Sequence, residues 1–320
     1  MRRRLAIASA IAISVAATCS HGAAYAQSVY VLSQDDGILS TIDAKTDEIT
    51  DKISLDGKPA AFTIDAANEK AYVTLPDSGE IAVIDLHRRV VSARFKIGGQ
   101  PFGIASDRHD RLFVGDWGAN RISIVNADTG IVENSLAVGR SPAHLATTRD
   151  GDRVYVADRE SNNVAVIDTS ALSVLKEVAV GRAPFALALS ADEQQLAVAN
   201  VQAATLSIID TRSLSVVASS PTRAMPYGVA ITNDNSEILV ANQHGGSVSI
   251  YDARSHLEQG EIKVGRYPEG VGTLADGSKA YVANWFSASV SVLDLKSKTE
   301  IKRIACPEGP RMVLVAGQPD

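Results

Sequence analysis

Residues 142–184 read PAHLATTRDGDRVYVADRESNNVAVIDTSALSVLKEVAVGRAP, and this stretch holds one complete unit of a repeat that runs through the chain. Short apolar runs alternate in it with polar turns rich in Asp, Asn, Gly and Ser. The apolar runs cover 142–148, 154–158, 163–168 and 173–180. Four short strands joined by turns predict one antiparallel blade of four strands.

Two markers repeat along the chain at the same interval. An Asp or Asn ends an apolar run at Asp43, Asp85, Asn126, Asp168, Asp210, Asp252 and Asp294. A proline recurs at Pro59, Pro101, Pro142, Pro184, Pro226, Pro268 and Pro310. Both markers step by 42 residues and share a single step of 41. A period of about 40 to 45 residues rich in short strands is typical of propeller blades, so seven repeats predict an all-β, seven-bladed β-propeller.

The two ends of the repeat array predict how the ring closes. Residues 29–55 supply three strands with no first strand before them, and residues 310–315 supply a first strand with no set after them. We therefore expect the C-terminal strand to join the N-terminal three strands, which leaves no isolated sheet edge. The propeller is expected to be a single domain over 27–320.

The repeat markers themselves have structural explanations. An Asp or Asn after the third strand can bond the backbone just ahead of it, so we interpret these residues as turn formers and not as metal ligands. Each proline is expected to begin a first strand, where a missing N–H costs no ladder bond. Strands such as 163–168 are apolar on both faces, as a sheet packed between two neighbouring blades requires.

The N-terminus predicts export. Arg2, Arg3 and Arg4 precede an apolar run of about 14 residues, too short to span a bilayer comfortably, and AYA at 24–26 is a good cleavage site. We predict a signal peptide over 1–26, cleavage after Ala26, a periplasmic location and no membrane insertion afterwards. A twin-arginine signal and a lipoprotein at Cys19 are weaker alternatives.

Charge and cysteine content narrow the function classes. Cleavage would remove three arginines and no acidic residue, so the net charge would fall from −6 to −9. A net acidic surface argues against a general nucleic-acid or membrane binder but leaves room for a local basic patch. After cleavage Cys306 would be the remaining cysteine, so the fold would contain no internal disulfide.

One face of the ring is predicted to collect basic and aromatic side chains, because blade-to-blade connections and second-to-third loops emerge together from antiparallel sheets. We call it the Arg/Trp face. The connections supply Lys58, Arg140, Arg182, Arg223, Arg266, Tyr267 and Arg311. The loops supply Trp117, Arg159, Gln243, His244, Trp285 and Phe286. These arginines either bond neighbouring loops as a repeat feature, or they bind an anionic ligand or an acidic protein partner.

The channel offers a second set of candidates. The position two after each proline is small in five repeats, and His144 and Met312 are the exceptions, which we interpret as filling the channel. Glu269 and Arg311 follow their prolines in adjacent blades and could pair. With His144 they form the one acid–base set that the sequence predicts.

Several enzyme classes lack their signatures. The sequence has no C-x-x-C-H haem site, nucleophile elbow, Walker loop or dinucleotide fingerprint. Five histidines in the predicted mature chain are too few for a propeller copper site. We predict no metal and no cofactor, and we expect a protein that is not an enzyme.

The chain resembles the YVTN-repeat β-propeller family over nearly all of its predicted mature length. The second strands read YVAN at 281–284, YVAD at 155–158 and LVAN at 239–242, and VGRAPFA at 180–186 and VGRYPEG at 264–270 join blades. The resemblance departs at Asn200, whose strand lacks the tyrosine, and at Ser33 and Leu75, which stand in the Asn/Asp position.

The resemblance implies a bacterial exported propeller that serves as a binding or scaffold protein. Some members are linked to single-stranded DNA binding, and others accompany periplasmic redox systems. Two alternatives follow. Seven-bladed lactonases use channel His, Glu and Arg residues, which here implies a lactonase- or lyase-like enzyme using His144, Glu269 and Arg311. Cofactor-free propeller subunits of amine dehydrogenases imply an accessory subunit of a redox complex.

Overall fold

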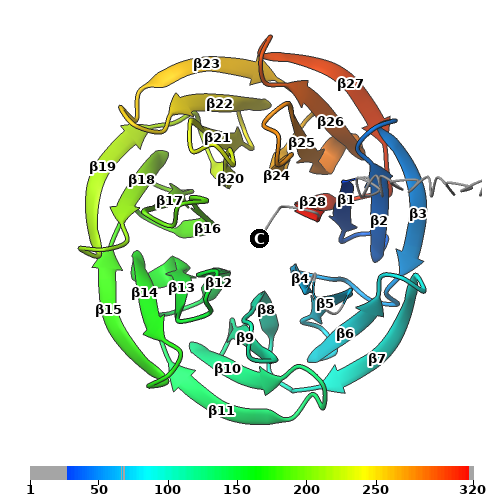
Figure 1. Ribbon diagram of the computed structural model, residues 1–320, viewed down its shortest axis with the longest axis vertical. Coiled ribbons are helices and arrows are strands. Elements are labelled where there is room, and N and C mark those ends of the chain that lie inside the picture. Colours follow the sequence, from blue (N-terminus) through cyan, green and yellow to red (C-terminus); the bar gives the residue numbers. More distant parts are fainter. Residues whose placement is uncertain (1–26, 66, 68, 317–320) are drawn as a thin grey trace, which may run out of the picture.

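The structure, a computed structural model, describes residues 27–316 except for residues 66 and 68. In that part of the chain, seven four-stranded antiparallel sheets surround a central axis like the blades of a propeller (Figure 1). The seven-bladed prediction is therefore confirmed. The predicted signal peptide, 1–26, lies outside the described residues.

Each blade is numbered here in chain order, with its strands given from the axis outward. Blade 1 contains β28 (Pro310–Ala316), β1 (Ser28–Ser33), β2 (Ile38–Asp43) and β3 (Glu48–Ser54). Blade 2 contains β4 (Phe62–Asp65), β5 (Lys70–Leu75), β6 (Glu80–Asp85) and β7 (Val90–Lys96). Blade 3 contains β8 (Pro101–Ser106), β9 (Arg111–Asp116), β10 (Arg121–Asn126) and β11 (Val132–Ala137).

The remaining four blades follow the same order. Blade 4 contains β12 (Pro142–Thr147), β13 (Arg153–Asp158), β14 (Asn163–Asp168) and β15 (Ser173–Ala179). Blade 5 contains β16 (Pro184–Leu189), β17 (Gln195–Asn200), β18 (Thr205–Asp210) and β19 (Ser215–Pro221). Blade 6 contains β20 (Pro226–Ile231), β21 (Glu237–Asn242), β22 (Ser247–Asp252) and β23 (Glu258–Lys263). Blade 7 contains β24 (Pro268–Thr273), β25 (Lys279–Asn284), β26 (Ser289–Asp294) and β27 (Thr299–Ala305).

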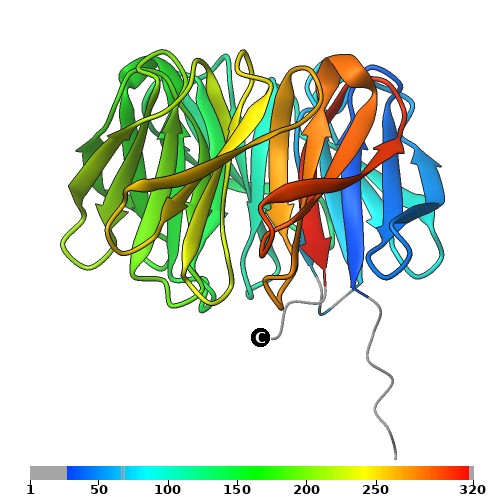
Figure 2. The ribbon, with the colours of Figure 1, turned by 90° about the horizontal axis from the view of Figure 1, so that it is seen from above.

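The two ends of the described chain close the ring within blade 1. Strand β28 pairs antiparallel with β1, with Ala316 opposite Ser28 and Val313 opposite Val31. Strand β1 also pairs with β2, so the last strand completes a sheet begun by the first three. The predicted closure is therefore confirmed, and both described ends lie on the same face of the ring (Figure 2).

The core lies between blades, where the second and third strands are buried on both faces. In β14, for example, the side chains from Val164 to Ile167 are fully buried. Each hydrophobic cluster joins neighbouring blades, as where Tyr155 of blade 4 packs with Leu196 and Val198 of blade 5. Because apolar strands meet from both sides, burial holds the ring together, and the one cysteine within residues 27–316, Cys306, is free.

The recurring Asp or Asn after the third strand forms a turn, as predicted. The Oδ1 atom of Asp168 accepts hydrogen bonds from the backbone N–H groups of Ser170 at 2.9 Å and Ala171 at 2.8 Å. The other six markers accept equivalent bonds from residues two or three positions ahead. These bonds lower the pKa of Asp168 and stabilise its ionised form.

The prediction that every proline begins a strand is wrong for Pro59. Strand β4 begins at Phe62, three residues later, whereas the other six prolines begin their strands. In blade 2, Thr74 stands where four other blades have alanine, and its hydroxyl donates to the carbonyl of Phe102 at 2.6 Å. The Thr74 hydroxyl also bonds to the backbone of Ala61, so it contacts the segment directly before β4.

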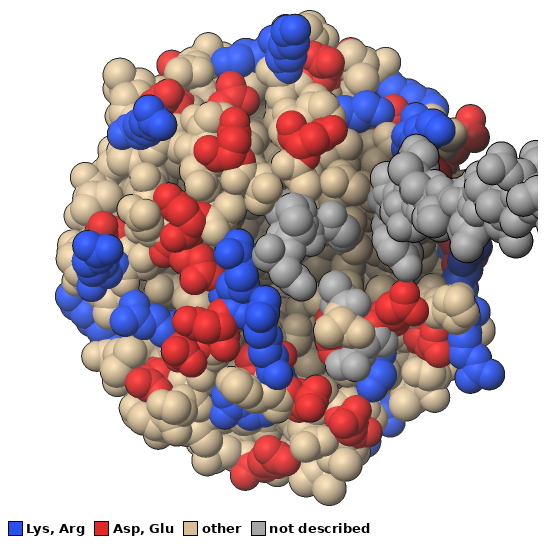
Figure 3. All heavy atoms as spheres, viewed as in Figure 1, with Lys and Arg blue, Asp and Glu red and all other residues tan. Residues whose placement is uncertain are grey.

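Figure 3 shows the face of the ring that carries the two described chain ends. Lys and Arg side chains alternate on it with Asp and Glu side chains, so neither sign of charge dominates. No helix among the described residues is long and apolar enough to cross a membrane.

Candidate functional site

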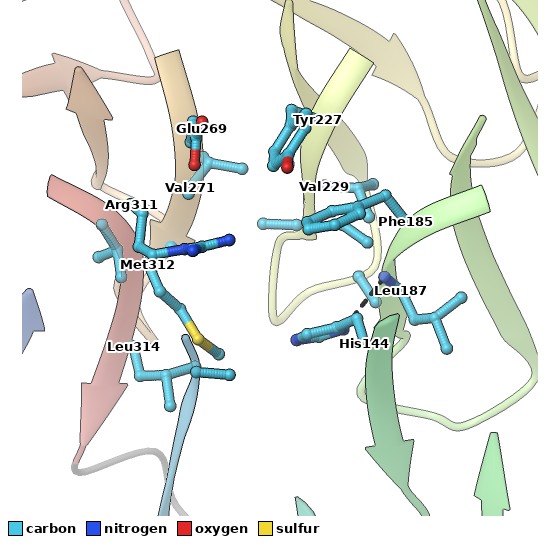
Figure 4. A pocket seen from close by; sticks show the side chains of 18 of the residues that line it. His144, Phe185, Leu187, Tyr227, Val229, Glu269, Val271, Arg311, Met312 and Leu314 are labelled. Carbon is cyan, nitrogen blue, oxygen red and sulfur yellow. Dashed lines mark hydrogen bonds between the residues drawn. The ribbon is translucent and has the colours of Figure 1, made fainter. Parts of the chain in front are cut away.

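A cavity of about 290 Å³ occupies the central channel. Its wall comes from the inner strands of the blades, which bring His144, Tyr227, Glu269 and Arg311 to one space (Figure 4). Apart from Thr273, the other side chains of the wall are apolar. All of the predicted acid–base residues line this cavity, and Tyr227 joins them.

Close approach of the inner strands explains the small residues two after the prolines. A side-chain carbon on Gly228 would lie 1.9 Å from the carbonyl oxygen of Glu269, and one on Gly103 would lie 1.9 Å from that of Ala143. Glycine is therefore required where neighbouring inner strands nearly touch. His144 and Met312 instead direct side chains into the cavity (Figure 4).

The residues directly after the prolines line the channel mouth on the Arg/Trp face. The rings of Phe102 and Phe185 lie 6.1 Å apart, and those of Phe185 and Tyr227 lie 4.1 Å apart. Sequence reasoning missed both phenylalanines as site residues. The signal was present, since they occupy the same repeat position as Glu269 and Arg311.

Arg311 lies between two aromatic rings at this mouth. Its guanidinium carbon is 5.4 Å from the ring centre of Phe102 and 5.7 Å from that of Trp285. Cation–π contacts of this kind hold the planar group in place. Within the described chain it has no hydrogen-bond acceptor and forms no ion pair, so its donors remain available.

Glu269 is buried beside Arg311 on the neighbouring inner strand. The residue is 6% exposed. Its Oε1 accepts a hydrogen bond from Gln243 Nε2 at 2.7 Å, whereas its Oε2 has no hydrogen-bond partner among the described residues. Burial raises the pKa of Glu269 to about 7, although Arg311 and Gln243 oppose the rise. The carboxyl group is therefore poised to hold a proton near neutral pH.

Tyr227 faces the same space from the strand on the other side of Glu269. Its hydroxyl forms no hydrogen bond within the described residues. Burial raises the pKa of Tyr227 to about 12, and the nearby Glu269 adds to the rise. The phenol therefore remains a neutral donor and acceptor at physiological pH.

His144 lies deeper in the channel than Glu269 and Arg311 (Figure 4). Its Nδ1 accepts a hydrogen bond from the backbone N–H of Leu187 at 3.2 Å. The ring proton must then be on Nε2, which is a free donor toward the cavity. Burial lowers the pKa of His144 to about 4, so the imidazole is neutral at pH 7.

Three arginines predicted to bind a ligand donate instead to a loop of the blade that follows them in the chain. The guanidinium group of Arg140 donates to the carbonyl of Glu160 at 2.7 Å, and that of Arg266 donates to the carbonyl of Phe286 at 2.7 Å. Arg182 makes a longer contact of 3.5 Å to the carbonyl of Gln202. The loop-bonding interpretation of these arginines accounts for their contacts.

The other predicted cations differ in their surroundings. Arg223 forms ion pairs with Glu258 at 2.9 Å and Glu261 at 3.4 Å. Arg159, in the short 3-10 helix η1 (Arg159–Ser161), is paired with Glu160. The ammonium group of Lys58 is exposed and unpaired in the described structure.

The predicted aromatic residues fall into two groups on the Arg/Trp face. The ring of Trp117 lies 4.7 Å from that of Phe102, beside the channel mouth. Farther out, His244 Nε2 lies 2.8 Å from the hydroxyl of Tyr267, whose ring is 4.4 Å from that of Phe286. Trp285 and Phe286 belong to the 3-10 helix η2 (Trp285–Ser287).

Two features bear on chemistry at the site. Glu269 and Arg311 attract each other but form no ion pair in the described structure, which leaves a gap between cation and carboxyl group. No group of three or more His, Cys, Asp or Glu side chains within residues described here is placed to bind a metal ion. The cavity therefore offers hydrogen-bond donors, one cation and one protonatable acid.

Comparison with known proteins supports the propeller. Residues 185–279, less than a third of the chain, match the family described as YNCE-like beta-propeller. No curated protein matches the sequence.

Two solved structures share the fold at low sequence identity. A hydrazine synthase chain from Kuenenia stuttgartiensis aligns with a TM-score of 0.72 and 18% identity, over 80% of this chain and 89% of that chain. A functionally unknown protein from Desulfotomaculum acetoxidans DSM 771 aligns with a TM-score of 0.78 and 15% identity, over 92% and 99%. Such likeness concerns the fold alone.

Proposed function

We propose that this chain is an exported, non-enzymatic propeller that binds an anionic ligand or an acidic partner at the Arg/Trp face, around the channel mouth. Export rests on the signal-peptide pattern of residues 1–26. We also assign the whole repeat array to the YVTN-repeat type, to which the YNCE-like propellers matched by residues 185–279 are related.

The observation that carries this proposal is the unpaired guanidinium of Arg311. It lies between Phe102 and Trp285 at the mouth of the cavity and has no acceptor in the described chain. A guanidinium fixed in this way is a ready partner for a carboxylate or phosphate group. Single-stranded nucleic acid, suggested by family resemblance, is one anion that the test must include.

Tryptophan fluorescence tests this binding, because both tryptophans of the chain lie near the mouth. The protein is titrated with a fifteen-residue oligothymidylate, with heparin and with hexanoate, and Arg311→Gln is compared with Arg212→Gln, an exposed arginine in the turn after β18. We expect at least one anion to bind, and Arg311→Gln to weaken it about tenfold or more. Equal affinity in the two variants would contradict a role for Arg311.

Native mass spectrometry of the protein purified from its own periplasm complements the titration. A bound anionic small molecule would support the proposal directly. A stable second chain would instead favour the accessory subunit of a redox complex.

The second candidate is a lactonase- or lyase-like enzyme, and the protonatable Glu269 is the observation that favours it. In this reading Glu269 would transfer a proton, and Arg311 would stabilise negative charge on the substrate. Glu269→Gln should then abolish an activity on lactone substrates while leaving the melting temperature unchanged. Persistence of that activity in the variant would exclude Glu269 as the acid or base.

A further inference from the structure

The number of available cations limits the kind of anion that the mouth can take. Among the described cationic residues predicted for this face, Arg311 is the one that lines the cavity. Arg140, Arg182 and Arg266 donate to loop carbonyls and keep their charge, but they do not belong to the cavity wall. A cavity lined by one guanidinium suits a ligand with one anionic group better than a polyanion, which needs several.

The neighbour of that guanidinium favours a carboxylate over a phosphate. Glu269 presents Oε2, a buried oxygen with no hydrogen-bond partner among the described residues, toward the same space. A singly charged carboxylate can share a proton with a carboxyl group, whereas a phosphate dianion would meet a second negative charge.

The groups that face Glu269 are consistent with a shared proton. Arg311 on β28 favours its ionised form, as does the hydrogen bond from Gln243, while Asp35 in the turn after β1 disfavours it. Tyr227 on β20 is neutral and can donate to a ligand oxygen. A carboxylate arriving between these groups adds negative charge, so its binding would draw a proton onto Glu269.

The channel below the mouth fits an apolar body. Phe185, Leu187, Val229, Val271 and Met312 surround the path inward from Arg311 (Figure 4). At the lower part of this path the Nε2–H of His144 offers a hydrogen bond. The volume of about 290 Å³ lies at the small end of ligand pockets.

We propose that the site takes a small monocarboxylic acid, with its carboxylate between Arg311, Tyr227 and the Glu269 carboxyl and its apolar body in the channel above His144. This inference rests on the proposed function, because it names the ligand class for the same mouth.

Paired probes test the ligand class. The purified protein is titrated by calorimetry with benzoate, phenylacetate and hexanoate, each beside its amide, at pH 6 and pH 8. At least one acid is expected to bind. Its amide is expected to bind at least about tenfold more weakly, because the amide lacks the charge that Arg311 recognises. With the pKa of Glu269 about 7, the affinity of the acid should fall about tenfold from pH 6 to pH 8.

Two variants separate recognition from folding. Arg311→Gln should lower the affinity for the acid about tenfold or more, while Arg212→Gln should leave it unchanged. Glu269→Gln should keep the affinity near its pH 6 value and abolish the fall toward pH 8, because the amide donates a hydrogen bond at every pH. If Glu269→Gln keeps the melting temperature of the unmodified protein and its affinity still falls from pH 6 to pH 8, Glu269 does not share a proton with the ligand.

The outcome also separates this inference from the proposed function. If no acid binds at millimolar concentration, or acids bind no better than amides, the ligand class is wrong. If heparin or oligothymidylate nevertheless binds through Arg311, the binding face still stands. Loss of all anion binding would reject both proposals.

Discussion

Asp158 occupies a position at which three other blades carry asparagine. Asn200, Asn242 and Asn284 each donate from Nδ2 to a serine hydroxyl on the adjacent strand, whereas the corresponding residue of blade 4 is Ala165. Asp158 is fully buried, its Oδ2 accepts a bond from Gly139, and its Oδ1 has no partner in the described structure. Burial therefore raises the pKa of Asp158 to about 7.

The first prediction, at the residue scale, is that Asp158→Asn stabilises the protein at alkaline pH. The folded state holds this proton up to about pH 7, whereas the unfolded chain loses it near the ordinary value of 3.8, so stability falls as pH rises between those values. The variant should gain about 2 to 4 kcal/mol at pH 8 and less at pH 5.

Denaturant unfolding at the two pH values measures this difference. Asn163, the cross-strand partner of Asp158, has an Oδ1 with no hydrogen-bond partner within the described part of the chain, and this oxygen can accept from the new amide. Asp168→Asn serves as the control in the same blade, because the carboxyl group of Asp168 is bonded as an anion and gains nothing from neutralisation. A loss of stability at pH 8 in Asp158→Asn would show that burial of the charge is not costly there.

At the scale of elements, the seam between blades 7 and 1 carries polar contacts that reinforce ring closure. The hydroxyl of Tyr281 on β25 donates to Asp47 Oδ1 at 2.5 Å, and Lys279 Nζ lies 2.7 Å from Asp47 Oδ2. Asp47 follows β2, so the bonds link the last complete blade to the N-terminal strands. A buried, charge-assisted pair of this kind is stronger than a surface ion pair.

The second prediction is that Tyr281→Phe destabilises the fold by about 1 to 3 kcal/mol, because the buried Asp47 carboxylate loses a donor. Tyr155 occupies the same repeat position in blade 4 but finds no such carboxylate. Tyr155→Phe is therefore the matched control and should cost less. If chemical denaturation shows that both variants lose the same free energy of unfolding, the bond from Tyr281 to Asp47 does not contribute to stability beyond an ordinary buried tyrosine.

At the scale of the whole molecule, a single strand completes the ring. Strand β28 pairs with β1 and also contributes Arg311 and Met312 to the channel. Its loss would leave β1 with an unpaired edge and open the interface with blade 7, where Val313 packs against Tyr281. Closure and the candidate site therefore depend on the same strand.

The third prediction is that deletion of residues 310–320 lowers the melting temperature by about 10 °C or more, because the packing across an entire blade interface is lost. A chain that ends at Ala316 keeps β28 and is the control. Differential scanning calorimetry of the two truncations gives the comparison. If the shorter chain melts like the control, the terminal strand does not secure the ring.

Much of the architecture could be predicted because its signals are local in sequence. The turn aspartates, the prolines and the apolar runs of 154–158 and 163–168 predicted four strands per blade, and the structure places β13 and β14 within one residue of those bounds. The exception at Pro59 lies in blade 2, where the Thr74 hydroxyl bonds to Ala61 just before β4 and to Phe102 of blade 3. Contacts between separate strands of this kind cannot be predicted from a local pattern.

The sequence by itself determined the seven-bladed ring, its closure by the C-terminal strand and the face on which basic and aromatic residues gather, since all three follow from the period and the antiparallel order of strands. Only the tertiary structure decided which of the predicted arginines lines the channel. Arg140, Arg182 and Arg266 share a glycine–arginine pattern and donate to nearby loops, while Arg311 is held between Phe102 and Trp285. These rings come from different blades, so their meeting with Arg311 depends on closure of the ring, which no single repeat contains.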